Sequence, residues 1–144
     1  MSTRLVLATT IFVALTAPAF ADGVDGVLIT QANAVAGSVT PGDAPGFPVT
    51  LTQPGLYKFA DNLTVPSGRT GILVNSDDVT IDLNGYRLRA AFFADNTIGI
   101  RSDHFNVTIR NGTIADFDTG IAARGINGIV EDSASSTTRS PSMP

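Results

Sequence analysis

The sequence contains no cysteine and only one histidine, His104, among its 144 residues. Without cysteine the chain can have neither a disulfide framework nor a thiolate metal site, and one histidine is too few for a histidine-based metal cluster. Basic residues are also scarce. The net charge of −4 at pH 7 argues against nucleic acid or an anionic membrane as the partner. Hydrophobic residues are plentiful, at 43% of the chain, which is enough for the packed core of one domain.

Residues 1–21 are predicted to be a secretory signal peptide. Arg4 provides a positive start, residues 5–16 are apolar, and residues 19–21 (Ala-Phe-Ala) form a small-x-small site, so we expect cleavage before Asp22. The apolar run is too short to span a bilayer, which argues against the alternative of a retained anchor. We therefore expect export, to the periplasm, the cell surface or the outside, with no membrane span after cleavage. An exported small chain without cysteine fits a bacterial source.

Three phrases repeat one another between Thr70 and Asp132. They are TGILVNSDDVTID, IGIRSDHFNVTIR and TGIAARGINGIVE, and each contains a Gly-Ile pair in the same two columns: Gly71-Ile72, Gly99-Ile100 and Gly120-Ile121. The glycines are 28 residues apart (71 to 99) and then 21 apart (99 to 120). A period of this length, made of short strands and turns, is typical of a solenoid.

Each phrase also has the two-residue period of a strand. Val79 and Ile81 alternate with polar residues, as do Val107 and Ile109. Residues two apart in a strand point to the same face, so we expect the apolar side chains to face inward and the polar ones to face water. One such strand cannot bury its apolar face alone, and we therefore predict that successive coils of the chain stack on one another.

The segment before the repeat is predicted to close the first coil. Residues 22–37 are interpreted as a helix that ends at Gly37 and lies across the open end of the stack, and residues 38–48 as a Pro/Gly-rich linker. Four apolar residues define the predicted helix face: Leu28, Ile29, Ala32 and Val35. The alternative is a partly ordered leader.

Residues 49–132 are predicted to form about three to four coils. The expected coils are residues 49–65, 70–88, 98–117 and 119 onward. Residues 89–97 are interpreted as a loop insertion, in which Phe92 and Phe93 are expected to pack back against the stack. Residues 133–144 are low in hydrophobicity and are expected to form a disordered tail, which leaves the C-terminal coil without an evident cap.

Asparagine and aspartate recur at one repeat position, just before the inward valine or glycine, as Asp78, Asn106 and Asn127. Both residue types tolerate a left-handed backbone and bond to nearby main chain, so we favour a structural role over ligand binding. Stacked side chains of this kind can also bond to each other along the stack. We interpret three Asn-x-Thr triplets, at Asn62, Asn106 and Asn111, as structural rather than as glycan acceptors.

These phrases resemble the right-handed parallel β-helix proteins of the pectin lyase-like superfamily over about residues 49–132. The matching pieces are NLTVP (62–66), VTIDLNG (79–85), NVTIRNGTI (106–114) and the Gly-Ile pairs. The resemblance implies an all-β fold: a short right-handed parallel β-helix of about three to four coils, with an N-terminal capping helix and a disordered C-terminal tail. It also implies a polysaccharide as a partner, because the superfamily includes polysaccharide lyases and glycoside hydrolases. It does not imply an activity, since fold does not fix function.

The chain departs from the enzymes of that superfamily, which usually have many more coils. One hypothesis is that it is an N-terminal piece of a longer β-helix. Another is that it completes its stack by self-association through the uncapped C-terminal coil, because an open strand edge invites pairing.

The resemblance implies which residue types could carry out chemistry. Lyases of this fold usually use Ca²⁺ with a basic residue, and hydrolases of this fold use several aspartates. The candidates are Asp77, Asp78, Asp82, Asp103, Asp116 and Asp118, with Arg87, Arg101 and Arg110. Asp77 and Asp78 are interpreted as solvated turn residues rather than a catalytic pair, and His104 as a solvated turn residue. Asp82 and Arg110 align in the repeat and are expected to form a cross-strand ion pair on the outer face, worth well under ~1 kcal/mol.

No catalytic, cofactor-binding or metal residue is assigned from the sequence. Ca²⁺ stays an open possibility through Asp95, Asp116 and Asp118, although nothing in the sequence places them together. We interpret the chain as an exported β-helix protein without an evident catalytic site, with a structural or carbohydrate-binding role at the cell envelope. The alternative is a fragment of a polysaccharide-active lyase or hydrolase. A third possibility, an adhesin like a phage spike, would require a trimerising segment that the sequence lacks.

Overall fold

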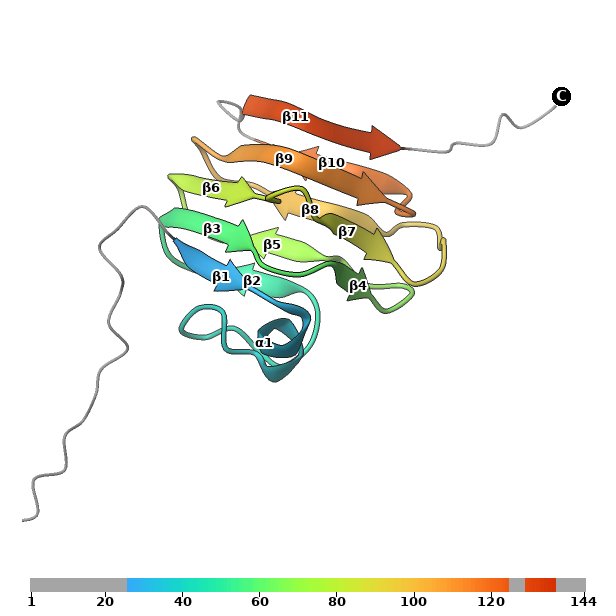
Figure 1. Ribbon diagram of the computed structural model, residues 1–144, viewed down its shortest axis with the longest axis horizontal. Helices are drawn as coiled ribbons and strands as arrows, with labels where there is room; N and C mark the ends of the chain where they lie inside the picture. Colours follow the sequence, from blue (N-terminus) through green and yellow to red (C-terminus); the bar gives the residue numbers. More distant parts are fainter. Residues whose placement is uncertain (1–25, 125–128, 137–144) are drawn as a thin grey trace, which may run out of the picture.

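A computed structural model describes residues 26–124 and 129–136 of the chain. The predicted signal peptide (residues 1–21), Asn127 and residues 137–144 of the predicted tail lie outside this part. The described part is an all-β parallel solenoid of about three turns with almost no helix (Figure 1), as the repeat predicts.

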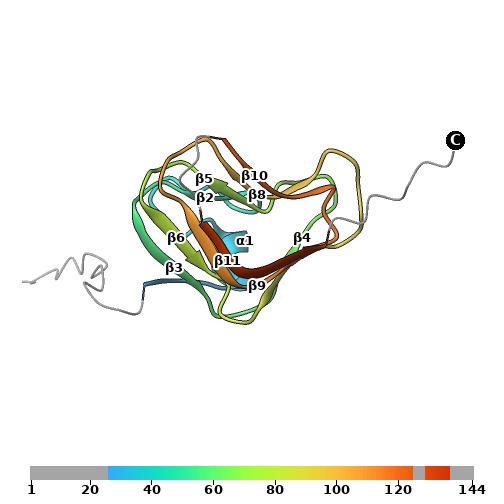
Figure 2. The same ribbon diagram turned by 90° about the horizontal axis from the view of Figure 1, so that it is seen from above.

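The strands of successive coils stack in parallel on three sides. The first side contains β2 (Val49–Leu51), β5 (Ile72–Val74), β8 (Ile98–Ser102) and β10 (Thr119–Ala123). The second side contains β1 (Val27–Ile29), β3 (Gly55–Phe59), β6 (Val79–Asp82), the first half of β9 (Thr108–Ala115) and the start of β11 (Ile129–Ser136). The third side contains β4 (Leu63–Val65), β7 (Arg87–Ala90) and the second halves of β9 and β11. Figure 2 shows these sides around the interior.

The predicted Gly-Ile column forms the inner row of the first side. Ile72 is in register with Val49 below it and Ile100 above it, and Ile100 is in register with Ile121. Val49, Ile72 and Ile100 are fully buried. Each buried aliphatic side chain of this size contributes about 2 kcal/mol from the hydrophobic effect, so matching rows of such residues hold the coils together.

The other two sides contribute rows of the same kind. On the second side Ile81 lies between Tyr57 and Ile109, and on the third side Leu88 lies between Leu63 and Ile114. These six residues all belong to one buried core. The predicted alternation of inward apolar and outward polar residues is therefore confirmed.

The glycines of the Gly-Ile pairs are required by the close approach of adjacent coils. A Cβ on Gly71 would lie 2.6 Å from the carbonyl oxygen of Gly99, and a Cβ on Gly99 would lie 2.5 Å from the carbonyl oxygen of Gly120. Real Cβ atoms are not found this close to a backbone oxygen. Any other residue in this column would push two coils apart, because the obstacle is backbone rather than a flexible side chain.

The structural interpretation of the Asn/Asp column is confirmed at its two described positions. Asp78 and Asn106 have φ values of 58° and 54°, in the left-handed region. Asn106 Nδ2 donates to Asp78 Oδ1 at 2.6 Å, so the two turns are bonded to each other along the stack. The side chains that permit the turn therefore also join one coil to the next.

The predicted helix over residues 22–37 is wrong in its first described part. Val27–Ile29 is strand β1, which pairs with β3, and the helix α1 covers only Gln31–Ala36. The helix begins after Thr30, whose hydroxyl accepts from Asn33 N while the Asn33 side chain accepts from Thr30 N. Pairing with β3 satisfies the backbone groups of β1, which is why a segment with a helix-like apolar spacing is extended.

The predicted apolar face of this segment is also wrong. Leu28 and Val35 are 51% and 53% exposed, and Ala34 is the buried residue of the helix instead. The predicted stop at Gly37 is confirmed, with φ at 70°. In Figure 1 α1 lies at the N-terminal end of the stack, near β2.

Side chains of the N-terminal segment occupy the edges that the first coil would otherwise leave open. Gln31 forms hydrogen bonds with the edge of β4: its side-chain amide donates to Thr64 O at 3.2 Å and accepts from Thr64 N at 2.9 Å. The edge of β2 is bonded by Thr40, which donates to Thr50 O, and by Asp43, which accepts from Thr50 N. An edge blocked in this way cannot pair with another strand at these positions.

The loop after the second coil differs from its prediction. Arg89 and Ala90 belong to β7 rather than to an insertion, and Phe92 and Phe93 are 75% and 53% exposed rather than packed against the stack. The buried core includes neither ring, and Phe117 is the only phenylalanine after β7 in residues 91–124 that belongs to it.

The C-terminal boundary also differs from its prediction. Residues 133–136, expected to be disordered, continue β11, with Ser133 in register with Gly112 and Ser135 with Ile114. Parallel pairing uses backbone groups, so strand β11 extends over residues whose side chains are too polar to signal it.

We expect Gly99→Ala to destabilise the fold by about 3 kcal/mol, because the new Cβ would collide with backbone and with Ile114. Chemical denaturation followed by far-UV circular dichroism measures this loss. The matched control is Gly68→Asn, where φ is 78° and no atom lies within 4 Å, so the cost should stay at roughly 1 kcal/mol. Equal losses in the two variants would contradict the close-approach explanation.

Candidate functional site

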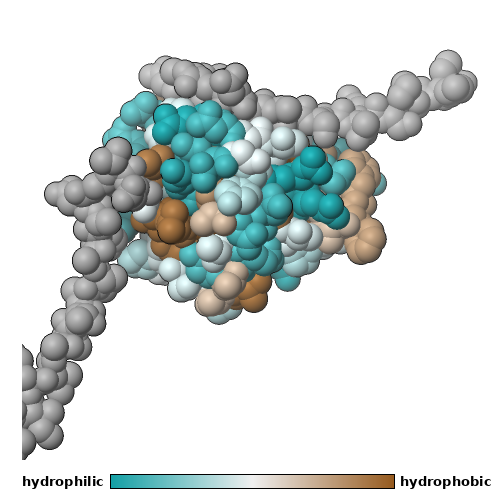
Figure 3. All heavy atoms as spheres, in the orientation of Figure 1, coloured by the Kyte–Doolittle hydropathy of each residue, from teal (hydrophilic) through white to brown (hydrophobic). Residues whose placement is uncertain are grey.

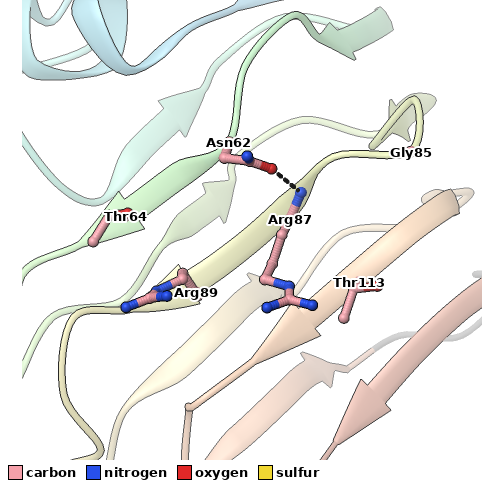
Figure 4. Close-up of a pocket in the computed structure, with 6 residues that line it drawn as sticks. All are labelled: Asn62, Thr64, Gly85, Arg87, Arg89 and Thr113. Atoms are coloured by element: carbon pink, nitrogen blue, oxygen red, sulfur yellow. Dashed lines mark hydrogen bonds between the residues drawn. The ribbon is translucent and has the colours of Figure 1, made fainter.

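A hollow of about 400 Å³ lies on the outer surface of the third side. Its lining residues are Asn62, Thr64, Gly85, Arg87, Arg89 and Thr113 (Figure 4). They come from three successive coils, so the stack itself creates the hollow.

Strand alternation points two arginines into this hollow. Leu88 and Ala90 of β7 are buried in the core, so Arg87 and Arg89 face outward. Residues two apart in a strand are separated by roughly 6.7 Å, which places the arginines side by side along one strand. Figure 4 shows both side chains on the same face of β7.

Two threonines flank the arginines on the neighbouring strands. Arg89 is in register with Thr64 of β4, and Arg87 is in register with Thr113 of β9. Neighbouring strands are about 4.8 Å apart, so each arginine has a hydroxyl one coil away. The result is a polar surface with two cationic groups and two groups that both donate and accept hydrogen bonds.

Hydrogen bonds between coils hold the floor of the hollow. Asn62 Oδ1 accepts from Arg87 N at 2.9 Å, and Gly85 N donates to the carbonyl oxygen of Asn111 at 2.6 Å. Gln31 bonds the backbone of Thr64 from the other side. The backbone beneath the two guanidinium groups is therefore fixed by three adjacent layers.

Among the side chains of residues 26–124, no carboxylate lies within 4.0 Å of the guanidinium of Arg87 or Arg89. Two other arginines do have acidic neighbours: Arg101 lies 3.5 Å from Asp103, and Arg110 lies 3.2 Å from Asp82. The arginines of the hollow therefore differ from those that serve the fold. Guanidinium groups bind carboxylate, sulfate or phosphate oxygens, often through two parallel hydrogen bonds.

The sequence identified only part of this site. Arg87 is among the basic candidates from the sequence, but Arg89 falls in the predicted loop insertion, and no sequence motif marks Thr64 or Thr113. These residues could be found from the buried row of the third side. Leu63, Leu88 and Ile114 form that row, and each has a neighbour in the chain that faces outward into the hollow.

The residues around His104 form a second polar cluster, at the corner between the first and second sides. His104 Nδ1 lies 3.0 Å from Asp77 Oδ1, and His104 Nε2 lies 3.3 Å from Asn75 Oδ1. Asp77 Oδ1 also accepts from Phe105 N at 3.0 Å. His104 is a partly exposed turn residue, as the sequence predicts, and in addition its side chain bonds the third coil to the second.

The hydrogen bonds of this cluster change the acidity of Asp77. The donor Phe105 N, followed by the bond to His104, holds the pKa of Asp77 below its ordinary value of 3.8. A carboxyl group with a lowered pKa stays ionised at neutral pH and cannot act as a general acid there.

The predicted ion pair between Asp82 and Arg110 is confirmed, with Arg110 Nε 3.2 Å from Asp82 Oδ2. Asp82 is buried rather than solvent-exposed. Its Oδ1 also accepts from Asn84 N and Asn111 Nδ2, at 2.8 and 3.2 Å. Burial on its own raises the pKa of Asp82, but the bonds from Asn84, Asn111 and Arg110 outweigh it, and the pKa lies below 3.8.

The other candidate carboxylates also serve local structure. Asp78 accepts from Asn106, Asp103 lies near Arg101, and Asp118 accepts from Asn96 N at 3.2 Å. Asp116 has a φ of 65°. Among the side chains of residues 26–124, no three acidic or histidine groups lie close enough to hold a metal ion, so the set considered for Ca²⁺ is not brought together.

No family model, no curated protein and no solved structure matches the chain. The described residues contain no helix long and apolar enough to cross a membrane.

The lowered pKa of Asp82 leads to a prediction about stability and pH. A carboxyl group with a depressed folded-state pKa stabilises the fold above its unfolded value, and this contribution is lost as the pH falls through the folded-state pKa. We expect Asp82→Asn to lower the unfolding free energy by about 1–2 kcal/mol at pH 7. The difference from wild type should shrink below about pH 3.8.

Thermal unfolding between neutral and acidic pH measures this difference. The matched control is Asp61→Asn, which removes an exposed carboxylate with no hydrogen bond among the described residues. A difference between Asp82→Asn and wild type that does not depend on pH would contradict the role given to the Asp82 carboxylate.

Proposed function

We propose that this protein is an exported, non-catalytic β-solenoid that binds an anionic polysaccharide at the cell envelope. The observation that carries the proposal is the pair Arg87 and Arg89, which project from one strand without a carboxylate partner in the described chain. A chain of net charge −4 that keeps two such groups side by side has a local surface suited to a regularly spaced anionic ligand.

The chemistry of the hollow matches acidic sugars in particular. Carboxylates of uronic acid units can bond to the guanidinium groups, and sugar hydroxyls can exchange hydrogen bonds with Thr64, Thr113 and the exposed side chain of Asn62. The lining residues come from three successive coils, so a polymer chain can contact the hollow on more than one coil. A rigid sheet with outward polar groups binds without an ordering cost in the backbone.

Membership of the pectin lyase-like superfamily is part of this proposal. It is supported by the NVTIRNGTI-type phrases together with the parallel three-sided stack. The capping role of α1 is also part of it, supported by the place of the helix at the N-terminal end and by the buried Ala34.

The alternative function, a fragment of a polysaccharide-active lyase or hydrolase, has less support. Glycoside hydrolysis needs a carboxylic acid with a raised pKa beside a second carboxylate. The two aspartates whose pKa values depart from the ordinary value, Asp77 and Asp82, are both shifted downward by their hydrogen bonds. Binding without catalysis is therefore the function that these residues favour.

We expect Arg87→Ala to weaken binding of a uronic acid polymer about ten- to a hundredfold at low salt, because it removes charge-assisted hydrogen bonds. Arg89→Ala should act in the same direction, and added salt should weaken wild-type binding. Isothermal titration calorimetry in a chelating buffer measures these affinities without a contribution from Ca²⁺.

The matched control for the arginine variants is Arg101→Ala. It removes the same charge from an exposed arginine on the first side, and it should bind as wild type does. No heat from the wild-type protein at millimolar polymer, or equal loss in all three variants, would rule out the hollow as the binding site.

Self-association through the C-terminal coil is a further part of the proposal. The N-terminal edges are occupied by β1, Gln31 and the pair Thr40 and Asp43. In the described chain no strand pairs with the far edge of β11. Two copies would therefore meet through their β11 ends, and association would stop at a dimer. Size-exclusion chromatography with light scattering should show dimers; a stable monomer at all concentrations would exclude this contact.

A further inference from the structure

Two adjacent phenylalanines are exposed in the loop that follows β7. Phe92 is 75% exposed and Phe93 is 53% exposed, whereas most other large apolar residues of the described chain belong to the core. Exposed aromatic surface is unfavourable in water at roughly 25 cal/mol per Å². The loop therefore exposes two aromatic rings at adjacent positions of the chain, and these two residues are called the aromatic patch below.

Hydrogen bonds hold this loop at both ends. Ala91 N donates to Val65 O at 2.8 Å, which continues the pairing of β7 with β4. At the other end the Thr97 hydroxyl donates to Ala94 O at 2.7 Å, and Thr119 N donates to Thr97 O at 2.9 Å. The phenylalanines are thus presented by a loop anchored to the coils on either side.

The patch lies beside the arginines of the hollow. Phe92 is three residues after Arg89, so their Cα atoms are at most about 11 Å apart. In Figure 1 the loop extends from the end of β7, and Figure 3 shows hydrophobic surface there next to hydrophilic surface over β7. One ligand of modest length can therefore contact both surfaces.

We propose that Phe92 and Phe93 form an apolar subsite for a sugar ring of the same anionic polysaccharide that Arg87 and Arg89 bind. This inference rests on the proposed function and adds to it that the ligand is an oligomer long enough to reach from the hollow to the loop. A pyranose ring suits the patch because its C–H groups pack on an aromatic face while its carboxylate remains free for a guanidinium.

Other occupants fit the surroundings less well. An anionic lipid surface is a broad plane and would face much of a chain whose net charge is −4, whereas a thin polymer meets only the surface around the two arginines. A protein partner needs roughly 20–30 residues on each side, whereas the hollow has six lining residues and the loop adds two exposed rings. Both occupants are tested as outcomes below.

The experiment compares Phe92→Ala and Phe93→Ala with Phe105→Ala, a control that removes an equally exposed ring (59%) from another corner of the coil. Titration calorimetry measures the affinity of each variant for a uronic acid monomer and for its longer oligomers. We expect Phe92→Ala to weaken oligomer binding about three- to tenfold and to leave monomer binding unchanged. Phe105→Ala should match wild type for both ligands.

Several results would overturn the subsite. Oligomer binding that is unchanged in Phe92→Ala and Phe93→Ala but lost in Arg87→Ala would remove the subsite and leave the proposed function intact. Equal weakening for monomer and oligomer would show that the rings do not form a separate subsite. Absence of oligomer binding by wild type would remove the proposed function as well. Sedimentation of wild type, but not of Phe92→Ala, with anionic phospholipid vesicles would show that the patch binds a membrane instead. For each variant, an unchanged thermal melt followed by circular dichroism confirms that the protein is folded.

Discussion

The parallel stacking of one coil on the next is the constraint on which the rest of the structure depends. Backbone pairing between coils requires every coil to repeat the same path closely, and the glycine column is the clearest consequence. Gly71 and Gly99 have a carbonyl oxygen of the next coil where a Cβ would be. Beside each glycine, Ile72 and Ile100 stack in register inside the core. The Gly-Ile pair therefore combines close backbone approach with burial of one large side chain.

The polar residues at the corners follow from the same constraint. A turn in every coil needs left-handed backbone at Asp78 and Asn106, and the side chains that tolerate it lie one above the other and bond. Asp82 is used similarly, as the acceptor for donors from its own coil and the next. Several aspartates already form hydrogen bonds or ion pairs between coils. Arg87 and Arg89 form no such ion pair among residues 26–124, so they are more informative about function than the aspartates.

Much of this architecture could be predicted from the sequence, because it depends on local patterns that repeat. The alternation around Val79 and Ile81 specifies a strand, the Gly-Ile pairs specify a buried row, and the turn residues specify bends. Each of these patterns spans only a few neighbouring residues. The pairing of Asp82 with Arg110 follows from their alignment in the repeat. For the candidate site the sequence supplied only Arg87, because outward residues of a strand carry no pattern until the buried column beside them is aligned.

Local patterns in the chain are enough to specify a stack of short strands in coils of fixed register, since alternation and repetition are properties of neighbouring residues. Which strand edges are already paired depends on the folded arrangement. Val27–Ile29 is a strand because β3 offers it a partner, although its apolar spacing also fits a helix. Phe92 lies outside the buried core, and Arg89 lines a hollow because β7 continues to pair with β4 for two residues beyond the predicted end of the coil at Leu88. These outcomes depend on residues distant in the chain, which a local pattern does not contain.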